Sequence, residues 1–414
     1  MRFGIFYEHQ LPKPWTDDAE YRLLQEALDQ VELADRLGFD YAWEVEHHFL
    51  DEYSHSSAPE VFLAAAAART KHIRLGHGIR QVIPNYNHPA RTAEGLATLD
   101  LISDGRVDFG IGEGATRMEL HGFDIPAKHK RAMSLEAAEQ VANMMVLDPY
   151  PGFESEFFSM PCRNVLPKPR QKPHPPMWMA CTNRDTIKVA ARNGIGALAF
   201  SFIDPDEAKA WSEIYYGIIA SDECVPLGHS VNANLAMVTG FSMHEDRETA
   251  IRNGREGFEF FGYAMRSLVA TDQVPGRTTL WDDFQAGRDP ATEAARVAAA
   301  IEAGDDYASC IGTPDDARRY LRELAEVGVD QVIFIQQAGR NQHDDICASL
   351  EMFAVEVLPE FTAGRADREA AKQERLAPHI AAALARKQWM QPLADADIPV
   401  VEASRKNFTP RPVG

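Results

Sequence analysis

Cysteine is scarce in this chain. The five cysteines among 414 residues are Cys162, Cys181, Cys224, Cys310 and Cys347. They are odd in number, they lie far apart, and none forms a CxxC pair, which argues against a disulfide framework and a structural zinc site. The sequence therefore predicts a protein of the reducing cytoplasm.

Long apolar runs and an excess of positive charge are also missing. No stretch reaches the roughly 20 apolar residues that span a bilayer, and the apolar start at Phe3–Tyr7 is too short for a secretory signal. The 42 Lys and Arg side chains face 62 Asp and Glu, so the net charge is −20. Such a chain repels nucleic acid and anionic membranes. We therefore expect a small molecule or another protein as the partner.

The chain does contain a regular alternation of short apolar runs with longer helical segments. The expected strands are Arg2–Tyr7, Tyr41–Glu44, Ile73–Gly78, Val107–Ile111, Met177–Ala180, Ala197–Phe202, Ala233–Thr239 and Gln331–Ile335. Eight strands that alternate with helices favour a (β/α)8 barrel of the TIM type. A doubly wound sheet is the second choice, because no G-x-G-x-x-G follows the first strand.

The barrel accounts for residues 1–360, with insertions expected at about 148–176 and about 254–306. The first insertion is rich in proline and aromatics and suggests a loop or hairpin, whereas the second suggests helices that cover a site. Residues 361–414 form a C-terminal extension that is charged and then helical. It is either a solvated tail or an arm that wraps a partner subunit.

In a β/α barrel the catalytic groups come from the carboxyl ends of the strands and the loops that follow. The second expected strand is followed by Glu46, His47 and His48. Histidines beside carboxylates serve as acid/base groups or metal ligands. Because adjacent residues of an extended strand point to opposite faces, we expect no shared metal at this pair.

Glycine is concentrated at two other strand ends. The third strand ends near Gly78 and Ile79, and the fourth is followed by Gly112, Glu113 and Gly114. Glycines at alternate positions suit a flat ligand that lies against the backbone, although ordinary glycine turns explain them too. The spacing is not that of a P-loop.

The end of the fifth strand suggests an anion site. Ala180, Cys181 and Thr182 lead into a helix that begins near Arg184. Amide donors at a helix N-terminus, together with Arg184, would bind a phosphate, and plain N-capping by Thr182 or Asn183 is the alternative. Ser201, at the end of the sixth strand, is a further cofactor-binding candidate. Cys181 alone is typical of a small buried residue.

Four segments carry a family resemblance: RFGIF, GFDYAWEVEHHF, NHPARTAEGLATLDLISDGRVDFGIGEG and ACTNRDTIKVAARNG. Over residues 1–360 the chain resembles the bacterial luciferase-like family of flavin-dependent monooxygenases. The resemblance implies a (β/α)8 barrel, a homodimer, and reduced FMN supplied by a separate reductase. It also implies that a flavin hydroperoxide formed with O2 oxidises a small apolar substrate such as an aldehyde or ketone.

The same resemblance assigns roles to single residues. It makes His47 the catalytic group that holds or transfers a proton, and it places Glu46 close to the isoalloxazine ring. It also suggests a non-proline cis peptide at Gly78–Ile79. Glu113 stands where luciferases have the arginine that pairs with the flavin phosphate, so we expect Arg184 and Thr182 to hold that phosphate. The alternative is that Glu113 faces elsewhere.

Other functions stay open at this point. A deazaflavin-dependent oxidoreductase that transfers hydride is the nearest alternative, although the E-H-H-F segment favours oxygen chemistry. A flavin-binding partner subunit without activity is another, and a metal-dependent hydrolase is a third. Tyr7, Trp43, Phe49, Phe202 and residues 258–265 either line an apolar cavity or belong to the core.

Overall fold

The computed structural model describes residues 1–289, 291–292, 294–295, 298 and 309–402. Within them, eight parallel strands close into a barrel in the order β1-β12-β9-β8-β7-β4-β3-β2. The barrel strands are β1 (Arg2–Tyr7), β2 (Tyr41–Glu44), β3 (Arg74–Gln81), β4 (Val107–Gly112), β7 (Met177–Cys181), β8 (Gly196–Ala199), β9 (Leu235–Thr239) and β12 (Gln331–Gln336). They coincide with the eight predicted strands, so the predicted (β/α)8 barrel is confirmed.

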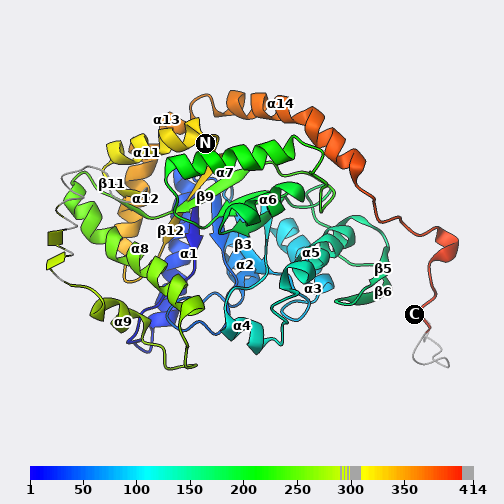
Figure 1. Ribbon diagram of the computed structural model, residues 1–414, viewed down its shortest axis with the longest axis horizontal. Coiled ribbons are helices and arrows are strands. Elements are labelled where there is room, and N and C mark those ends of the chain that lie inside the picture. The colour runs from blue at the N-terminus through cyan, green and yellow to red at the C-terminus, as the bar shows by residue number, and fades with distance from the viewer. Residues whose placement is uncertain (290, 293, 296–297, 299–308, 403–414) are drawn as a thin grey trace, which may run out of the picture.

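Helices surround the barrel and begin where the sequence signals place them (Figure 1). They are α1 (Ala19–Leu37), α2 (Pro59–Arg69), α3 (Pro89–Ile102), α5 (Lys130–Val146), α6 (Arg184–Arg192), α7 (Pro205–Ile219), α11 (Pro314–Glu326) and α12 (His343–Glu356). Gly38 ends α1 in the left-handed conformation, with φ of 88°. Thr313 opens α11 with a capping box ahead of Pro314.

Aromatic rings fill the interior of the barrel. Trp43 and Trp178 pack edge to face, with ring centroids 5.4 Å apart, and both are almost fully buried. Gly76 makes room for this pair, because a Cβ there would lie 2.2 Å from Cε3 of Trp43. The centre is therefore a packed core that includes Trp43. Tyr7 belongs to a second core cluster, between the strands and the surrounding helices.

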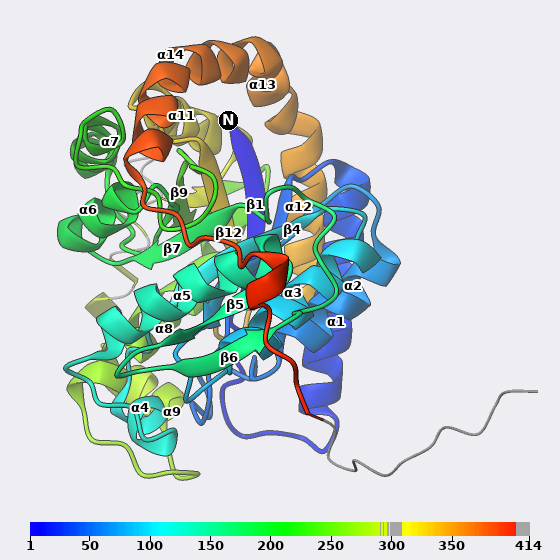
Figure 2. The ribbon, with the colours of Figure 1, turned by 90° about the vertical axis from the view of Figure 1, so that its right-hand side faces the viewer.

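Both expected insertions contain regular structure. The first is an antiparallel hairpin of β5 (Tyr150–Glu154) and β6 (Ser159–Arg163). The second includes α8 (Arg247–Ala270) and α9 (Leu280–Ala286), while positions 290, 293, 296–297 and 299–306 lie outside the described residues. The short helix α4 (Arg117–Gly122) and the paired strands β10 (Phe241–Met243) and β11 (Cys310–Gly312) were not expected. Both views place α4 and α9 at the end toward which β1 runs (Figures 1 and 2).

The C-terminal extension folds back onto its own barrel. After α13 (Leu358–Thr362), helix α14 (Arg365–Arg386) crosses the end opposite α4 and α9 (Figure 2). Arg2 donates two hydrogen bonds to Glu369, at 2.7 and 2.9 Å. Leu376 is buried, and Trp389 stacks on His229 at 4.9 Å. A contact between this extension and a partner subunit stays a prediction.

A cavity of about 760 Å³ lies between α14 and the amino ends of the barrel strands. Its wall combines Arg74 and Asp108 of the barrel with Arg368 and Lys372 of α14. In the part of the chain described here, no helix is both long enough and apolar enough to cross a membrane.

Docking of α14 predicts a stability cost for Leu376→Ala. Truncation of a buried leucine removes its apolar contacts, so the free energy of unfolding should fall by about 2–5 kcal/mol in urea titrations. Glu374→Ala, on the exposed face of the same helix, is the matched control and should leave the midpoint unchanged. Equal midpoints for both variants would show that α14 is undocked in solution.

Candidate functional site

Backbone strain marks the carboxyl end of the barrel. His9, Phe49, Phe202 and Gln337 have left-handed φ values of 54°, 66°, 48° and 50°. They follow β1, β2, β8 and β12, and none is a glycine. Strain of this kind costs about 1–3 kcal/mol per residue and is concentrated at functional sites. The candidate site therefore lies where these strands end.

His47 is oriented by a carboxylate from α4. Its Nδ1 lies 2.8 Å from Oε1 of Glu119, and the backbone N–H of His48 donates to the same oxygen at 3.2 Å. Thr116 caps α4 and donates its hydroxyl to Oε2 of Glu119 at 2.8 Å. Glu119 is thus fixed on both oxygens, and it holds the ring of His47 in one orientation.

A second carboxylate faces the other ring nitrogen of His47. Oε2 of Glu8 lies 3.7 Å from Nε2 of His47. Oε1 of Glu8 accepts a hydrogen bond from the hydroxyl of Tyr53 at 3.0 Å. Glu8 is only 3% exposed, and among the described residues its Oε2 accepts no hydrogen bond. His47 is therefore flanked by carboxylates on both sides.

This arrangement raises the pKa of both groups. Burial lowers the pKa of His47, but Glu119 and Glu8 together outweigh it and raise that pKa to about 9. Burial raises the pKa of Glu8 to about 7, although His47 and Tyr53 oppose the shift. His47 is consequently an imidazolium at neutral pH, and Glu8 is the group that titrates there.

His48 follows the end of β2 with His47, and its side chain has a different carboxylate partner. Its Nε2 lies 3.1 Å from Oε1 of Glu46. Glu46 is buried and also accepts from the backbone N–H of Gln81 at 2.9 Å and from Nδ2 of Asn87 at 2.8 Å. Across the described ranges, no group of three or more His, Cys, Asp or Glu side chains is placed to hold a metal ion.

The glycines near the ends of β3 and β4 allow close packing. A Cβ on Gly112 would lie 2.0 Å from Cδ1 of Ile79, so the side chain of Ile79 packs against the backbone of Gly112. The register between β3 and β4 shifts between His77 and Arg80, as in a β-bulge. Cis peptide bonds recorded for the described residues all precede proline. The cis bond expected at Gly78–Ile79 is therefore wrong, and the bulge accommodates the chain there.

Glu113, which follows β4, is paired with cations of α5. Arg131 of α5 donates to both of its carboxylate oxygens, at 3.0 and 2.9 Å, and Lys130 donates to the carbonyl of Gly114 at 2.6 Å. Asp185, at the start of α6, also acts electrostatically on Arg131. Arg131 therefore lies between the ends of β4 and β7. Sequence reasoning missed it because it follows Glu113 by 18 residues, and the only signal was the Lys-Arg pair that opens α5.

At the start of α6, Arg184 and the backbone N–H groups of Asp185 and Thr186 already have hydrogen-bond partners in the protein. Arg184 donates to Glu207 at 2.7 Å and is exposed. Asn183 is the N-cap, and its Oδ1 accepts from the backbone N–H groups of Asp185 and Thr186, each at 3.0 Å. The capping alternative is confirmed for Asn183. The backbone N–H groups of Asp185 and Thr186 are engaged in this cap, and the phosphate site expected here stays a prediction.

The remaining candidates near β7 and β8 lie close together. Ser201 donates its hydroxyl to the carbonyl of Thr182 at 2.8 Å, which joins the ends of the two strands. Ala180 packs against the barrel core. Cys181 is fully buried, and burial raises the pKa of its thiol to about 12, so it is not a thiolate nucleophile.

Aromatic side chains lead from β8 to His47. Phe202 packs edge to face with Phe258 and Phe261 of α8, at 5.0 and 5.8 Å. Phe261 lies 5.8 Å from Tyr53, and Tyr53 lies 5.6 Å from His47. These rings form an aromatic wall whose polar end is the His47 cluster.

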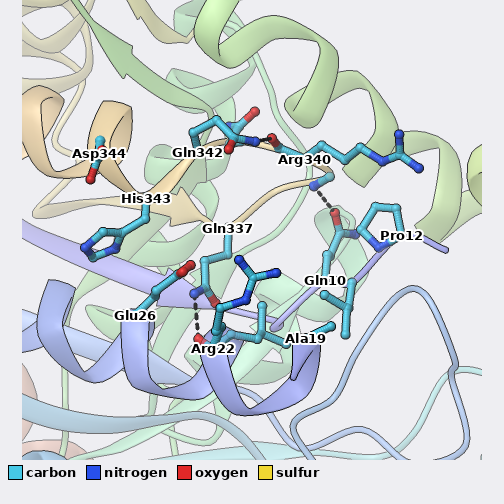
Figure 3. Close-up of a pocket in the computed structure, with 14 residues that line it drawn as sticks. Gln10, Pro12, Ala19, Arg22, Glu26, Gln337, Arg340, Gln342, His343 and Asp344 are labelled. Carbon is cyan, nitrogen blue, oxygen red and sulfur yellow. Dashed lines mark hydrogen bonds between the residues drawn. The ribbon is translucent and has the colours of Figure 1, made fainter. Parts of the chain in front are cut away.

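A separate cavity of about 440 Å³ lies between α1 and the loop after β12 (Figure 3). Gln10, Arg22, Gln337 and Arg340 are among the residues that line it. Gln337 connects its wall to the interior, because its Oε1 lies 3.0 Å from Nδ1 of the buried His9. This cavity is distinct from the aromatic wall.

The elevated pKa of His47 predicts a pH-dependent stability. An unfolded histidine has a pKa near 6.5, so the stabilisation is full below that pH and disappears as the pH rises through 9. The difference amounts to about 3 kcal/mol at most. Thermal unfolding between pH 7 and 9.5 should show a falling Tm for the wild type and a flatter curve for His47→Gln. His121→Gln, at an exposed histidine, should keep the wild-type slope, and an unchanged slope in His47→Gln would contradict the assignment.

Comparisons with known proteins agree with this architecture. A family model described as luciferase-like monooxygenase matches residues 1–331. The oxygenase component of a flavin-dependent trigonelline monooxygenase from Acinetobacter baylyi is 26% identical over 89% of this chain and 98% of its own length. Limonene 1,2-monooxygenase from Rhodococcus erythropolis is 29% identical over 87% of this chain and 86% of its own.

Solved structures share the barrel. A monooxygenase from Streptomyces bottropensis superposes with a TM-score of 0.69 at 27% identity, covering 87% of this chain and all of its own. The oxygenating constituent of 3,6-diketocamphane monooxygenase from Pseudomonas putida, in complex with FMN, gives 0.67 at 18% identity over 87% and 98%. A coenzyme F420-dependent reductase from Methanopyrus kandleri gives 0.58 at 22% identity over 87% and 99%. The last two show likeness of fold alone.

Proposed function

The chain belongs to the luciferase-like monooxygenase family, and we propose that it is the oxygenase component of a two-component system. In this proposal it uses reduced FMN and O2 to oxidise a small apolar organic substrate, such as an aldehyde or ketone. The observation that carries the proposal is an imidazolium, His47, held at the polar end of an aromatic wall. A proton donor and an apolar surface are what oxygen insertion into such a substrate requires.

The donor set at the strand ends fits a flavin. A phosphate needs cations, and Arg131 and Lys130 supply them beside Glu113. The polar edge of a flavin ring needs hydrogen-bonding groups. Oε1 of the buried Gln81 accepts no hydrogen bond from any of the described residues. The proposed flavin-contacting residues are Glu46, Gly78, Ile79, Gly112, Glu113, Gly114, Ala180, Cys181, Thr182, Arg184 and Ser201, to which Arg131 is added.

Bound reduced flavin would supply the electrons that activate O2. His47 would donate a hydrogen bond or a proton from Nε2 to the reacting oxygen, because Nδ1 is committed to Glu119. The partly exposed Phe202 and Phe258 of this wall, backed by the buried Phe261, would contact the apolar part of the substrate and exclude water.

The partners follow from the same proposal. We propose a separate flavin reductase, as the printed name of the Acinetobacter relative implies for that protein. We also propose a homodimer, supported by the exposed apolar side chains Val61, Leu101 and Ile102 on the neighbouring helices α2 and α3. The described cysteines are all free thiols, which supports the reducing cytoplasm as the location.

Rapid mixing with oxygen tests the proposed cofactor. The purified single chain should bind reduced FMN anaerobically and, after mixing with O2, give a transient absorbance distinct from that of oxidised flavin. The His47→Gln variant should shorten the lifetime of this transient by about tenfold or more, because a stabilising hydrogen bond from a charged donor contributes about 1.5–3 kcal/mol. Binding of reduced deazaflavin with no response to FMN would favour the hydride-transfer alternative instead, which the fold of the Methanopyrus neighbour leaves as the second candidate.

Two arginine variants separate the proposed phosphate ligands. Arg131→Ala should weaken FMN binding by about tenfold or more, since a charge-assisted contact contributes about 1.5–3 kcal/mol. Arg184→Ala should have a smaller effect, because that guanidinium is exposed and bound to Glu207. Fluorescence titration measures the affinity of each variant for FMN and for riboflavin. Only the affinity for FMN should fall, because riboflavin carries no phosphate. The reverse order would restore Arg184 as the principal ligand.

A further inference from the structure

One carboxylate oxygen of the buried Glu8 accepts no hydrogen bond from the described residues. Glu8 is the first residue after β1, it is 3% exposed, and the oxygen without a donor is Oε2. A buried carboxylate oxygen without a donor costs free energy unless the group is protonated or meets a ligand. The nearest polar atom recorded for that oxygen is Nε2 of His47, at 3.7 Å.

The charges around Glu8 come from several elements. His47 and Tyr53 face it from the segment after β2, Glu119 from α4, and Glu44 from β2. Glu44 is in turn bound to Nε2 of His9 at 2.9 Å, on the far side of the cluster. The cluster around His47 thus holds one cation and two facing carboxyl groups in a water-poor space.

Like charges so close together in the interior do not both ionise readily. Glu119 keeps its charge, because His47, Thr116 and the N–H of His48 all donate to it. Glu8 has Tyr53 as its one recorded donor. The extra proton of the cluster therefore belongs on Glu8, beside the ring nitrogen that faces the reaction.

We propose that Glu8 is the proton-relay residue of this site, which returns a proton to Nε2 of His47 after His47 has given one to the reacting oxygen. In that step the O–H bond at Oε2 of Glu8 breaks and an N–H bond forms at Nε2, with the electron pair of the O–H bond remaining on the carboxylate. A small rotation of the Glu8 side chain shortens 3.7 Å to hydrogen-bond reach, about 3.2 Å. The inference rests on the proposed function and acts through His47.

The first test needs no flavin. Difference infrared spectra of the apo-protein between pH 5 and 9 should contain the C=O band of a buried carboxylic acid that disappears with a midpoint near 7. The band should be absent in Glu8→Gln and retained in Glu46→Gln, at another buried carboxyl of the same strand ends. A band that survives in Glu8→Gln, or no such band in the wild type, would overturn the proposal.

Tyr53→Phe tests whether the titrating carboxyl is Glu8. The hydroxyl of Tyr53 favours the ionised form of Glu8, so its removal should move the midpoint of the band upward by about one pH unit, a tenfold change in proton affinity. A midpoint that does not move would show that the titrating group is not Glu8.

The second test measures turnover with reduced FMN. Glu8→Gln should lower kcat by about 10²-fold at pH 7 with little change in KM, and Glu8→Asp should restore part of it. A kcat within twofold of the wild type would overturn the relay. If the wild type itself does not react with reduced FMN, the proposed function fails, while the infrared result still decides the state of Glu8.

Discussion

The contact between His47 and Glu119 is the constraint on which the rest of the site depends. A cation and a carboxylate removed from water must compensate each other, and each requires further hydrogen bonds to remain charged. Thr116 and the backbone of His48 provide those bonds to Glu119. The short helix α4, which interrupts the regular β/α alternation, thereby supplies the carboxylate that raises the pKa of His47 most and that also raises the pKa of Glu8.

The sequence predicted the barrel because strand and helix periodicities are local. All eight strands, the proline starts at Pro59 and Pro89, and the glycine end of α1 can be recognised within a few neighbouring residues. His47 was found for the same reason, since it follows a strand directly. The electrostatic partners were not found, because Glu119 lies 72 residues further along the chain on a helix too short to show periodicity.

The glycines show what a local pattern leaves open. Gly112 follows a strand at the end where ligands bind, and a local pattern cannot distinguish space for a ligand from space for a neighbour. In the structure the side chain of Ile79 packs against the backbone of Gly112, next to the register shift between β3 and β4. Arg184 shows a related limit, because its partner Glu207 belongs to the next helix.

Closure of the barrel has a consequence for synthesis of the chain. Strand β1 pairs with β12, so Arg2 lies opposite Gln331. At about 5–20 residues per second, a ribosome needs on the order of 15–65 s to make the intervening segment. During that interval one edge of β1 has no native neighbour, and an open strand edge invites pairing with other chains. The strong negative charge of the chain, −20, makes nascent copies repel one another until β12 has been synthesised and can pair with β1.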